Sequence, residues 1–337
     1  MKITATVPMR IDLAGGTLDV YPLYLFEDGG LTLNAAIDVT AAATIETRDD
    51  ARVSIRSSDL GLCEEHASLD EMPLGHGLDL ARRAVAQMRP PTGINVTMDS
   101  HAPKGSGLGA SSALLMALLH ALNALREEPQ RLTSPQILDL GANLEAQVIG
   151  IPTGKQDYFP PIWGGVSALW FEVDGWRLEK LSDDRDLVSW LNQRVVVSYT
   201  SIPHDSAVTN WAMLKRYIEG EGDAVARMRD IKAIALAMRD ALHDMDHDRF
   251  VSLMDDEWQL RRGLAEGVST PEIEAYMAAA KSAGADASKI CGAGGGGCMV
   301  TLAAPSRQAQ VRQALTDAGA RVMDAHVVSQ GIQLTYR

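Results

Sequence analysis

Cysteine is scarce in this sequence of 337 residues, which contains only three. A small, odd number of cysteines argues against a disulfide framework and favours a reducing compartment. The first residues do not form a basic segment followed by an apolar one, and no apolar run reaches the ~20 residues that span a membrane. We therefore expect a cytoplasmic protein with no membrane partner.

Basic residues are outnumbered, since the sequence has 31 Lys and Arg and 44 Asp and Glu, which gives a formal net charge of −13. Binding to the nucleic-acid backbone depends on basic groups that neutralise phosphates, so nucleic acid is not an expected partner. A local cluster of Lys or Arg can still bind a small anion. His243 and His247 are spaced like a metal-binding pair, but the aspartates around them are typical of a solvated helix turn.

Glycine is abundant at one place that has the pattern of an anion site. Gly105, Gly107 and Gly109 alternate, which lets the backbone turn sharply close to a ligand. Residues 94–99 before them alternate like a strand, and residues 113–125 after them are helix formers. Backbone N–H groups at a helix start attract anions, and the helix dipole adds to this attraction. The unit therefore predicts a phosphate site.

Two other phosphate loops fit this stretch less well. A Walker loop requires Gly-Lys-Ser/Thr, and the sequence contains none. A dinucleotide fingerprint fits Gly105, Gly107 and Ala110, but it needs a second strand soon after the helix. The chain instead passes through Pro129 into another helix near Pro135. A simple glycine turn before a buried helix stays open as an alternative.

The stretch resembles the central motif of the GHMP kinases, the family of galactokinase, homoserine kinase, mevalonate kinase and phosphomevalonate kinase. The family pattern Pro-x-Gly-x-Gly-Leu-Gly-x-Ser-Ser-Ala is matched from Pro103 to Ala113. The resemblance implies that the loop binds the ATP phosphates and that the Ser111 hydroxyl reaches Mg²⁺. The loop consists of Pro103, Lys104, Gly105, Ser106, Gly107, Leu108, Gly109, Ala110, Ser111 and Ser112.

Two distant segments strengthen this resemblance. Residues 7–19 resemble the galactokinase opening, with Pro8, Arg10, Gly15 and Asp19 at the family's spacings. Residues 289–298 contain five glycines and lead directly into an apolar, strand-like run. They resemble the third motif, which closes over substrate and phosphate. Together the three motifs cover nearly the whole chain, and as a set they are specific.

The resemblance also supplies candidate catalytic residues. Residues 150–157 resemble the galactokinase segment that ends in the catalytic aspartate, which implies that Asp157 is the general base. Arg10 is the expected cationic neighbour, which would hold Asp157 ionised and stabilise charge in the transition state. Glu145 is expected in the last turn of a helix, where a carboxylate opposes the dipole. A glutamate at about this place binds magnesium in mevalonate kinase-like members, so Glu145 is our candidate metal ligand. The alternative is a surface glutamate.

Several residues bear on the substrate. Asp19 matches the galactokinase aspartate that hydrogen-bonds the sugar, although Gly16 and Thr17 stand where galactokinase has Glu-His. The segments that contain Gly15, Gly16 and Lys155 look more like the heptose phosphate kinase branch. Those enzymes phosphorylate the anomeric hydroxyl of D-glycero-D-manno-heptose 7-phosphate. Lys155 would then face the substrate phosphate or, equally, be a solvated lysine. The remaining candidate substrate contacts are His204, in a polar loop that could also cap a helix, and Gly294 and Gly295 in the third motif.

The coarse pattern predicts an α+β protein, because strands and helices segregate without a βαβ rhythm. We expect strands at 3–7, 35–47, 52–56, 94–99, 166–173, 194–199, 299–304 and 330–336. We expect helices at 77–88, 111–125, 135–149, 205–219, 224–243 and 307–318. The resemblance implies a two-domain GHMP kinase fold, in which residues 1–175 resemble ribosomal protein S5 and residues 176–337 form a ferredoxin-like domain.

The expected function is that of an ATP- and Mg²⁺-dependent kinase for a hydroxyl, anomeric by resemblance, of a sugar or sugar phosphate. Two alternatives stay open. One is a mevalonate-type kinase, and the other is an inactive relative that senses ATP and a sugar. The sequence does not decide between a monomer and a homodimer.

Overall fold

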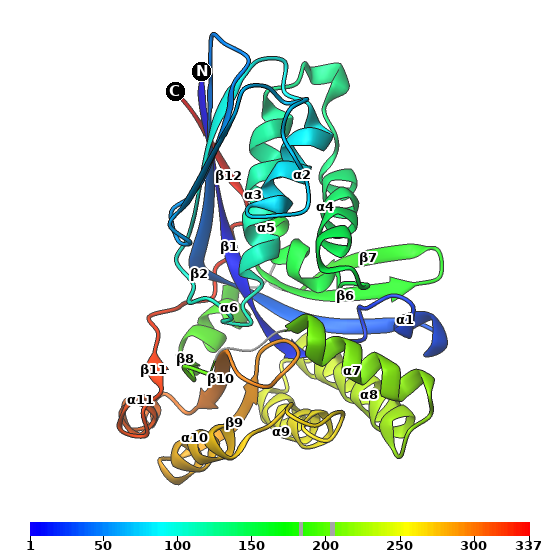
Figure 1. The fold of residues 1–337 in the computed structure, drawn as a ribbon. Coiled ribbons are helices and arrows are strands. Elements are labelled where there is room, and N and C mark those ends of the chain that lie inside the picture. The colour runs from blue at the N-terminus through cyan, green and yellow to red at the C-terminus, as the bar shows by residue number, and fades with distance from the viewer. Residues whose placement is uncertain (182–184, 203–205) are drawn as a thin grey trace.

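The structure is a computed structural model that describes residues 1–181, 185–202 and 206–337. Figure 1 shows an upper and a lower part, each with its own sheet, and the two chain ends lie side by side at the top. The ends are joined by hydrogen bonds between Lys2 and Arg337. The α+β class and the organisation in two parts predicted from the sequence are confirmed.

The upper part is built on an eight-stranded sheet. Its order is β12-β1-β2-β5-β3-β4, and β6 pairs with both β2 and β7. The long strand β2 pairs with two strands on the same edge, with β6 through its first residues and with β5 through its last residues. The strands are β1 (Lys2–Ala14), β2 (Gly30–Thr47), β3 (Val53–Ser57), β4 (Leu62–His66), β5 (Ile94–Ser100), β6 (Val166–Glu172), β7 (Gly175–Lys180) and β12 (Gln333–Tyr336).

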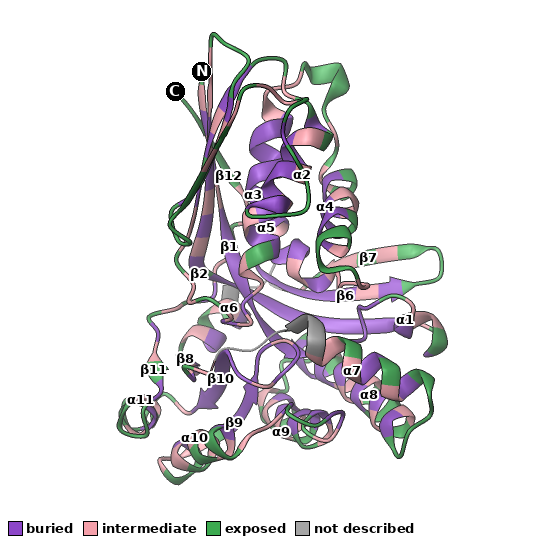
Figure 2. Ribbon diagram, in the orientation of Figure 1, coloured by how far each residue is buried: buried purple, intermediate pink, exposed green. Residues whose placement is uncertain are grey.

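Helices cover one face of this sheet, as Figures 1 and 2 show. Helix α3 buries 11 of its 15 residues, in agreement with its nearly uniform apolar sequence. Helix α4 begins with a capping box between Thr133 and Gln136 and ends at Gly150 in the left-handed conformation. The helices and 3-10 turns of this part are α1 (Leu23–Phe26), α2 (Asp79–Met88), α3 (Ala110–Ala124), η1 (Glu128–Gln130), α4 (Ser134–Ile149), η2 (Gln156–Tyr158) and α5 (Phe159–Trp163).

The lower part contains an antiparallel sheet of four strands in the order β11-β8-β10-β9. Strand β8 comes first in the chain, then the helices α7 to α10, β9, β10, α11 and β11, which is the ferredoxin-like pattern expected for this region. Its elements are α6 (Arg185–Asn192), β8 (Val195–Tyr199), α7 (Ser206–Ile218), α8 (Ala224–His243), α9 (His247–Arg261), α10 (Pro271–Ser282), β9 (Ala285–Ile290), β10 (Cys298–Ala303), α11 (Gln308–Asp317) and β11 (Arg321–Val322). No helix in the described part of the chain is long and apolar enough to cross a membrane.

The predicted boundary at residue 175 does not separate the two sheets. Residue 175 opens β7, which pairs along its whole length with β6 of the upper sheet. The last strand, β12, also returns from the end of the chain to pair with β1. A single cut therefore cannot divide the chain into its two sheets, although the helices and strands between residues 185 and 322 belong to the lower part.

Candidate active site

The glycine loop lies where the two parts meet, between β5 and α3. Gly105, Gly107 and Gly109 all adopt positive φ, between 67° and 73°, which favours glycine. Gly109 directly precedes the first turn of α3. Arg10 N of β1 donates to Leu108 O at 3.2 Å, and Cys298 N of β10 donates to Ser106 O at 2.6 Å. Strands of both sheets therefore hold the backbone of the loop in place.

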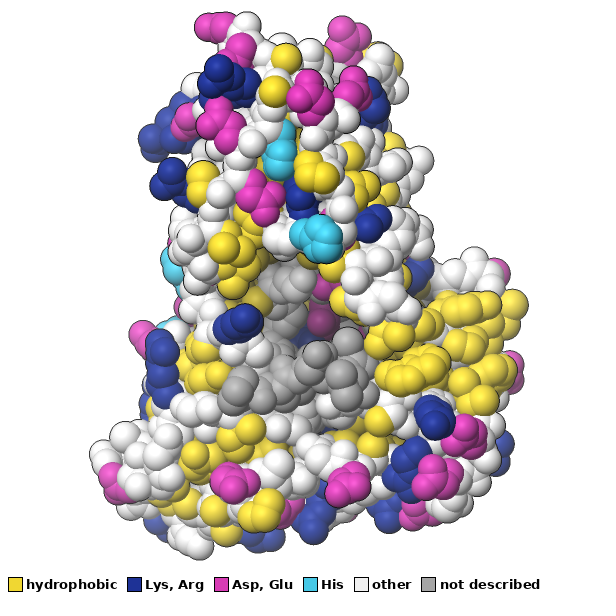
Figure 3. Space-filling view, viewed as in Figure 1, with side chains coloured by type: hydrophobic (Ala, Val, Ile, Leu, Met, Phe, Trp, Pro, Cys, Tyr) yellow, Lys and Arg dark blue, Asp and Glu magenta, His cyan; other side chains and the backbone are white. Residues whose placement is uncertain are grey.

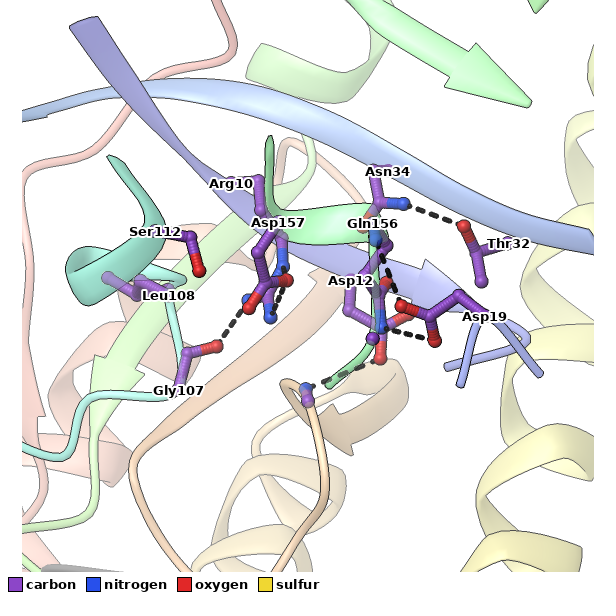
Figure 4. Close-up of polar contacts among 12 residues, drawn as sticks. Arg10, Asp12, Asp19, Thr32, Asn34, Gly107, Leu108, Ser112, Gln156 and Asp157 are labelled. Atoms are coloured by element: carbon purple, nitrogen blue, oxygen red, sulfur yellow. Dashed lines mark hydrogen bonds and ion pairs between the residues drawn. The ribbon is translucent and has the colours of Figure 1, made fainter. Parts of the chain in front are cut away.

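Arg10 and Asp157 form an ion pair beside this loop, as the sequence predicts (Figure 4). Nε and Nη2 of Arg10 lie 2.8 and 2.6 Å from the same oxygen, Oδ1 of Asp157. Nη1 of Arg10 donates to the carbonyl of Gly107, so one guanidinium joins Asp157 to the glycine loop. Burial alone would lower the pKa of Arg10, but Asp157 and Asp12 outweigh it and raise that pKa. The pair is held in fixed geometry on one wall of the cleft.

Glu145 is buried rather than on the surface, which rules out the surface alternative. Ser112 Oγ donates to its Oε2 at 2.8 Å, and the Tyr158 hydroxyl donates to the same oxygen. Burial raises the pKa of Glu145, and the hydrogen bonds from Tyr158, Ser111 and Ser112 offset part of that rise. A cation would stabilise this carboxylate in its charged form.

The chemistry of these donors fits a magnesium ion. Mg²⁺ prefers oxygen ligands and is usually held by one or two carboxylates together with substrate phosphates and water. The Glu145 carboxylate and the Ser111 hydroxyl line the same cavity as the glycine loop. Within the described residues, no group of three or more His, Cys, Asp or Glu forms a ready metal site. The protein would therefore supply only a minority of the ligands.

Three cavities follow one another along the cleft and share walls. The first, of about 420 Å³, lies beside α2 and α3 and has apolar walls that include Met98 and Leu114. The second, of about 390 Å³, shares Gly105, Ala110 and Ser111 with the first. Figure 3 shows the surface hollowed at this level, between the upper and lower parts.

The third cavity, of about 40 Å³, shares Arg10, Asp157 and Asn210 with the second. Asp19 also lines it, and accepts hydrogen bonds from Gln156 N at 2.9 Å and Gln156 Nε2 at 3.4 Å (Figure 4). Burial raises the pKa of Asp19 to about 6, although the Gln156 backbone bond opposes the shift. Thr17 Oγ1 donates to Asn210 Oδ1 at 3.3 Å across the same cavity. This end of the cleft is therefore polar and suited to hydroxyl groups.

Some predicted substrate residues lie elsewhere. A Cβ on Gly294 would meet Val268, and Gly295 N donates to Val268 O at 2.7 Å. These two glycines therefore pack against the loop before α10, and the third motif reaches the cavity through Gly292 and Ala293 instead.

Gly15 and Gly16 are also backbone supports rather than cavity walls. A Cβ on Gly15 would lie 2.0 Å from Leu31 O, and one on Gly16 would lie 2.7 Å from Asp12 Oδ2. Lys155 Nζ binds Asp139 Oδ1 at 2.9 Å and is absent from the described lining of the three cavities, which favours the solvated alternative over a place opposite a substrate phosphate. His204 lies outside the described residues.

Sequence reasoning missed three residues of the site. Gln156 and Tyr158 flank Asp157 in η2, and they were not identified because their partners, Asp19 and Glu145, are distant in sequence. Asp12 alternates with Arg10 along β1, and its oxygen accepts from Gly292 N at 3.3 Å. The one available signal for Asp12 was a charged residue within an apolar strand.

Comparison with known proteins agrees with this geometry. The family model for the GHMP kinase N-terminal domain matches residues 79–165, and that for the C-terminal domain matches residues 238–321. This chain belongs to the GHMP kinase family. The matched ranges contain the glycine loop, Glu145 and Asp157 in the first and the third motif in the second.

Its similar relatives include both sugar kinases and mevalonate kinases. A D-glycero-alpha-D-manno-heptose 7-phosphate kinase from Campylobacter jejuni is 26% identical over 98% of this chain and 98% of its own. A mevalonate kinase from Thermococcus onnurineus is 28% identical over 99% of this chain and 98% of its own. Among solved structures, a D-glycero-D-manno-heptose 1-phosphate kinase from Bacteroides thetaiotaomicron matches with a TM-score of 0.80 and 25% identity, over 99% of each chain.

Proposed function

We propose that this GHMP kinase transfers the γ-phosphoryl group of ATP to the anomeric hydroxyl of a sugar phosphate such as D-glycero-D-manno-heptose 7-phosphate. The observation that carries the proposal is the row of three connected cavities, with the Arg10–Asp157 pair on the wall between the second and the third. The similarity to heptose phosphate kinases over nearly the full length supports the choice of sugar.

The first two cavities suit a nucleotide. A purine base needs a flat apolar slot, and Leu78, Met98 and Leu118 supply apolar walls in the first cavity. The glycine loop then offers backbone N–H groups and the start of α3 to the phosphates. Ser111 and Glu145 would hold the magnesium ion, which when bound neutralises charge on the phosphates.

Asp157 is the proposed general base, which receives the proton of the acceptor hydroxyl. Because Arg10 binds Oδ1, the proposed partner of the hydroxyl is Oδ2. The acceptor oxygen attacks the γ-phosphorus as its proton passes to Asp157, the bond from the γ-phosphorus to the bridging oxygen breaks, and ADP leaves. Arg10 fixes the carboxylate and stabilises negative charge that develops on the transferring group.

The third cavity favours a polyol over a carboxylate substrate. Its described lining includes Thr17, Gln156 and Asn210 together with two carboxylates, Asp19 and Asp157. Arg10 is its one positive group among the described residues, and Asp157 already occupies that guanidinium. An anionic group, whether the carboxylate of mevalonate or the phosphate of a sugar phosphate, would meet negative charge here, whereas sugar hydroxyls can donate to Asp19. The proposal therefore puts only the hydroxyl-bearing end of the sugar in this cavity and its phosphate outside it.

The test is a coupled ADP-release assay with MgATP and a panel of heptose 7-phosphate, hexose 6-phosphates, free aldoses and mevalonate. We expect the highest kcat/KM with a phosphorylated sugar. Preference for a free aldose would indicate a galactokinase-like substrate without a phosphate. Preference for mevalonate would contradict the proposal that the substrate is a sugar. Absence of turnover with ATP still bound would favour an inactive sensor.

A further inference from the structure

Four charged side chains lie fully buried beneath the third cavity, and the proposed chemistry does not use them. They are Asp12, Glu257, Arg261 and Lys289, each with 0% exposure. We call them the buried charge cluster. It contains two carboxylates and two cations, so its formal charges balance. Buried charges are costly unless they are paired, so a cluster of this kind calls for a physical explanation.

Lys289 is the link between the two carboxylates. Its Nζ lies 3.4 Å from Asp12 Oδ1 of β1 and 3.3 Å from Glu257 Oε2 of α9. Arg261, one helical turn after Glu257, donates Nε and Nη2 to Glu257 Oε1 at 2.8 and 2.6 Å. Burial alone would raise the pKa of Glu257, but Arg261 and Lys289 together lower it, so this carboxylate is charged. The cluster thus connects the upper sheet with α9 and β9 of the lower part.

The hydrogen bonds that leave the cluster end on backbone groups in one wall of the third cavity and directly before the other wall. Glu257 Oε1 accepts from Gly15 N at 3.3 Å, and Arg261 Nη2 donates to Gly16 O at 2.8 Å. Asp12 Oδ2 accepts from Gly292 N at 3.3 Å. Gly15 and Gly16 lead directly to Thr17 and Asp19 on one wall, and Gly292 is itself part of the other.

We propose that Lys289 is a positioning residue for the phosphoryl acceptor, because its buried ammonium holds Asp12 and Glu257 where their oxygens bind the backbone of Gly292, in one wall of the acceptor cavity, and of Gly15, directly before the other wall. The kinetic part of this inference rests on the proposed function. Lys289 touches neither the nucleotide cavities nor the acceptor cavity, since the described lining of all three excludes it. Its effect is therefore expected on acceptor binding rather than on ATP binding.

The first test is hydrogen exchange followed by mass spectrometry on the full chain, which needs no substrate. In Lys289→Met, the amide of Gly292 should exchange at least tenfold faster, because Asp12 loses its cation. The amide of Gly15 should exchange faster by a smaller factor, because Glu257 loses Lys289 but keeps Arg261. The matched control is Val300→Ala. Val300 is the buried cross-strand partner of Lys289, so its truncation loosens the same sheet without removing charge. The control should leave Gly15 protected.

Unchanged exchange at Gly15 and Gly292 in Lys289→Met, or the same pattern in Val300→Ala, would overturn the inference. If Lys289→Met does not fold, Asp12→Asn provides the second variant. Its amide can offer oxygen to only one of Lys289 and Gly292 N, so we expect faster exchange at Gly292 while Gly15 stays protected. Protection retained at Gly292 in that variant would equally refute the role.

The second test separates KM from kcat. Lys289→Met should raise the acceptor KM at least tenfold and change the ATP KM less than twofold, and Lys289→Arg should restore most of the acceptor affinity. Equal changes in both KM values would show a general structural role and contradict positioning. If the wild-type protein phosphorylates no acceptor, the proposed function fails, while the exchange experiment still decides the positioning role.

Discussion

Asp157→Asn is the substitution that probes the proposed chemistry most selectively. The change is isosteric, and the amide oxygen of asparagine can still accept from Nε and Nη2 of Arg10, which both bind the single oxygen Oδ1. The amide NH₂ then replaces Oδ2. The substrate hydroxyl therefore faces a hydrogen-bond donor, which cannot take up its proton. The glycine loop and its Gly107 contact with Arg10 should remain in place.

The expected loss follows from general base catalysis, which typically contributes about 10²–10⁴ to rate, equivalent to roughly 2.7–5.4 kcal/mol of transition-state free energy. We expect kcat to fall by about that factor while the ATP KM stays within twofold, measured by ADP release. The matched control is Asp139→Asn, an exposed carboxylate that binds Lys155 away from the cavities and should leave kcat unchanged. A kcat within fivefold of wild type in Asp157→Asn would refute the base assignment.

Three further predictions concern metal, pH and backbone. Ser111→Ala should raise the magnesium concentration needed for half-maximal rate, and an unchanged magnesium titration would remove Ser111 from the metal site. Asp19 has its pKa raised from 3.8 to about 6, so the folded state binds the extra proton and loses stability as pH rises from about 4 to 6. In urea unfolding at pH 4 and pH 8, the free energy of unfolding of Asp19→Asn should therefore rise by up to about 3 kcal/mol relative to wild type at the higher pH. The same difference at both pH values would contradict the raised pKa of Asp19. Gly297→Ala, at φ +77° and with its new Cβ 2.7 Å from Ser106 O, should displace the glycine loop and raise the ATP KM, whereas Gly267→Ala, at φ +82° in open space, should not. Equal ATP KM values in the two alanine variants would show that the contact with Ser106 does not matter.

The glycine loop and the Arg10–Asp157 pair could be predicted because local motifs encode them. The loop needs glycine at positions of positive φ, and the ion pair joins two segments that each carry a family pattern. Helix α4 was also predictable, since a capping box and a terminal glycine mark its two ends.

Other features depend on contacts that no local pattern encodes. Glu257 and Arg261 have the i, i+4 spacing of an ordinary exposed helix pair, yet both side chains are fully buried. Helix α9 was not predicted, because its sequence is polar and shows no clear apolar face. The sequence left Lys155 open between a phosphate contact and a solvated lysine, because its partner Asp139 lies 16 residues earlier on α4 and becomes a neighbour only after folding. The boundary at residue 175 does not separate the two sheets for a similar reason, because β7 pairs with β6 and β12 rejoins the first sheet from the far end of the chain.

The most direct test of the central claim is phosphorus NMR of a reaction with MgATP and D-glycero-D-manno-heptose 7-phosphate. The proposed function predicts that the ATP signals convert to ADP while one new signal appears with the chemical shift and coupling of an anomeric phosphate. The signal should be missing with Asp157→Asn over the same time. A new phosphate ester on any other hydroxyl, or ATP unchanged beside a folded protein, would contradict the assignment.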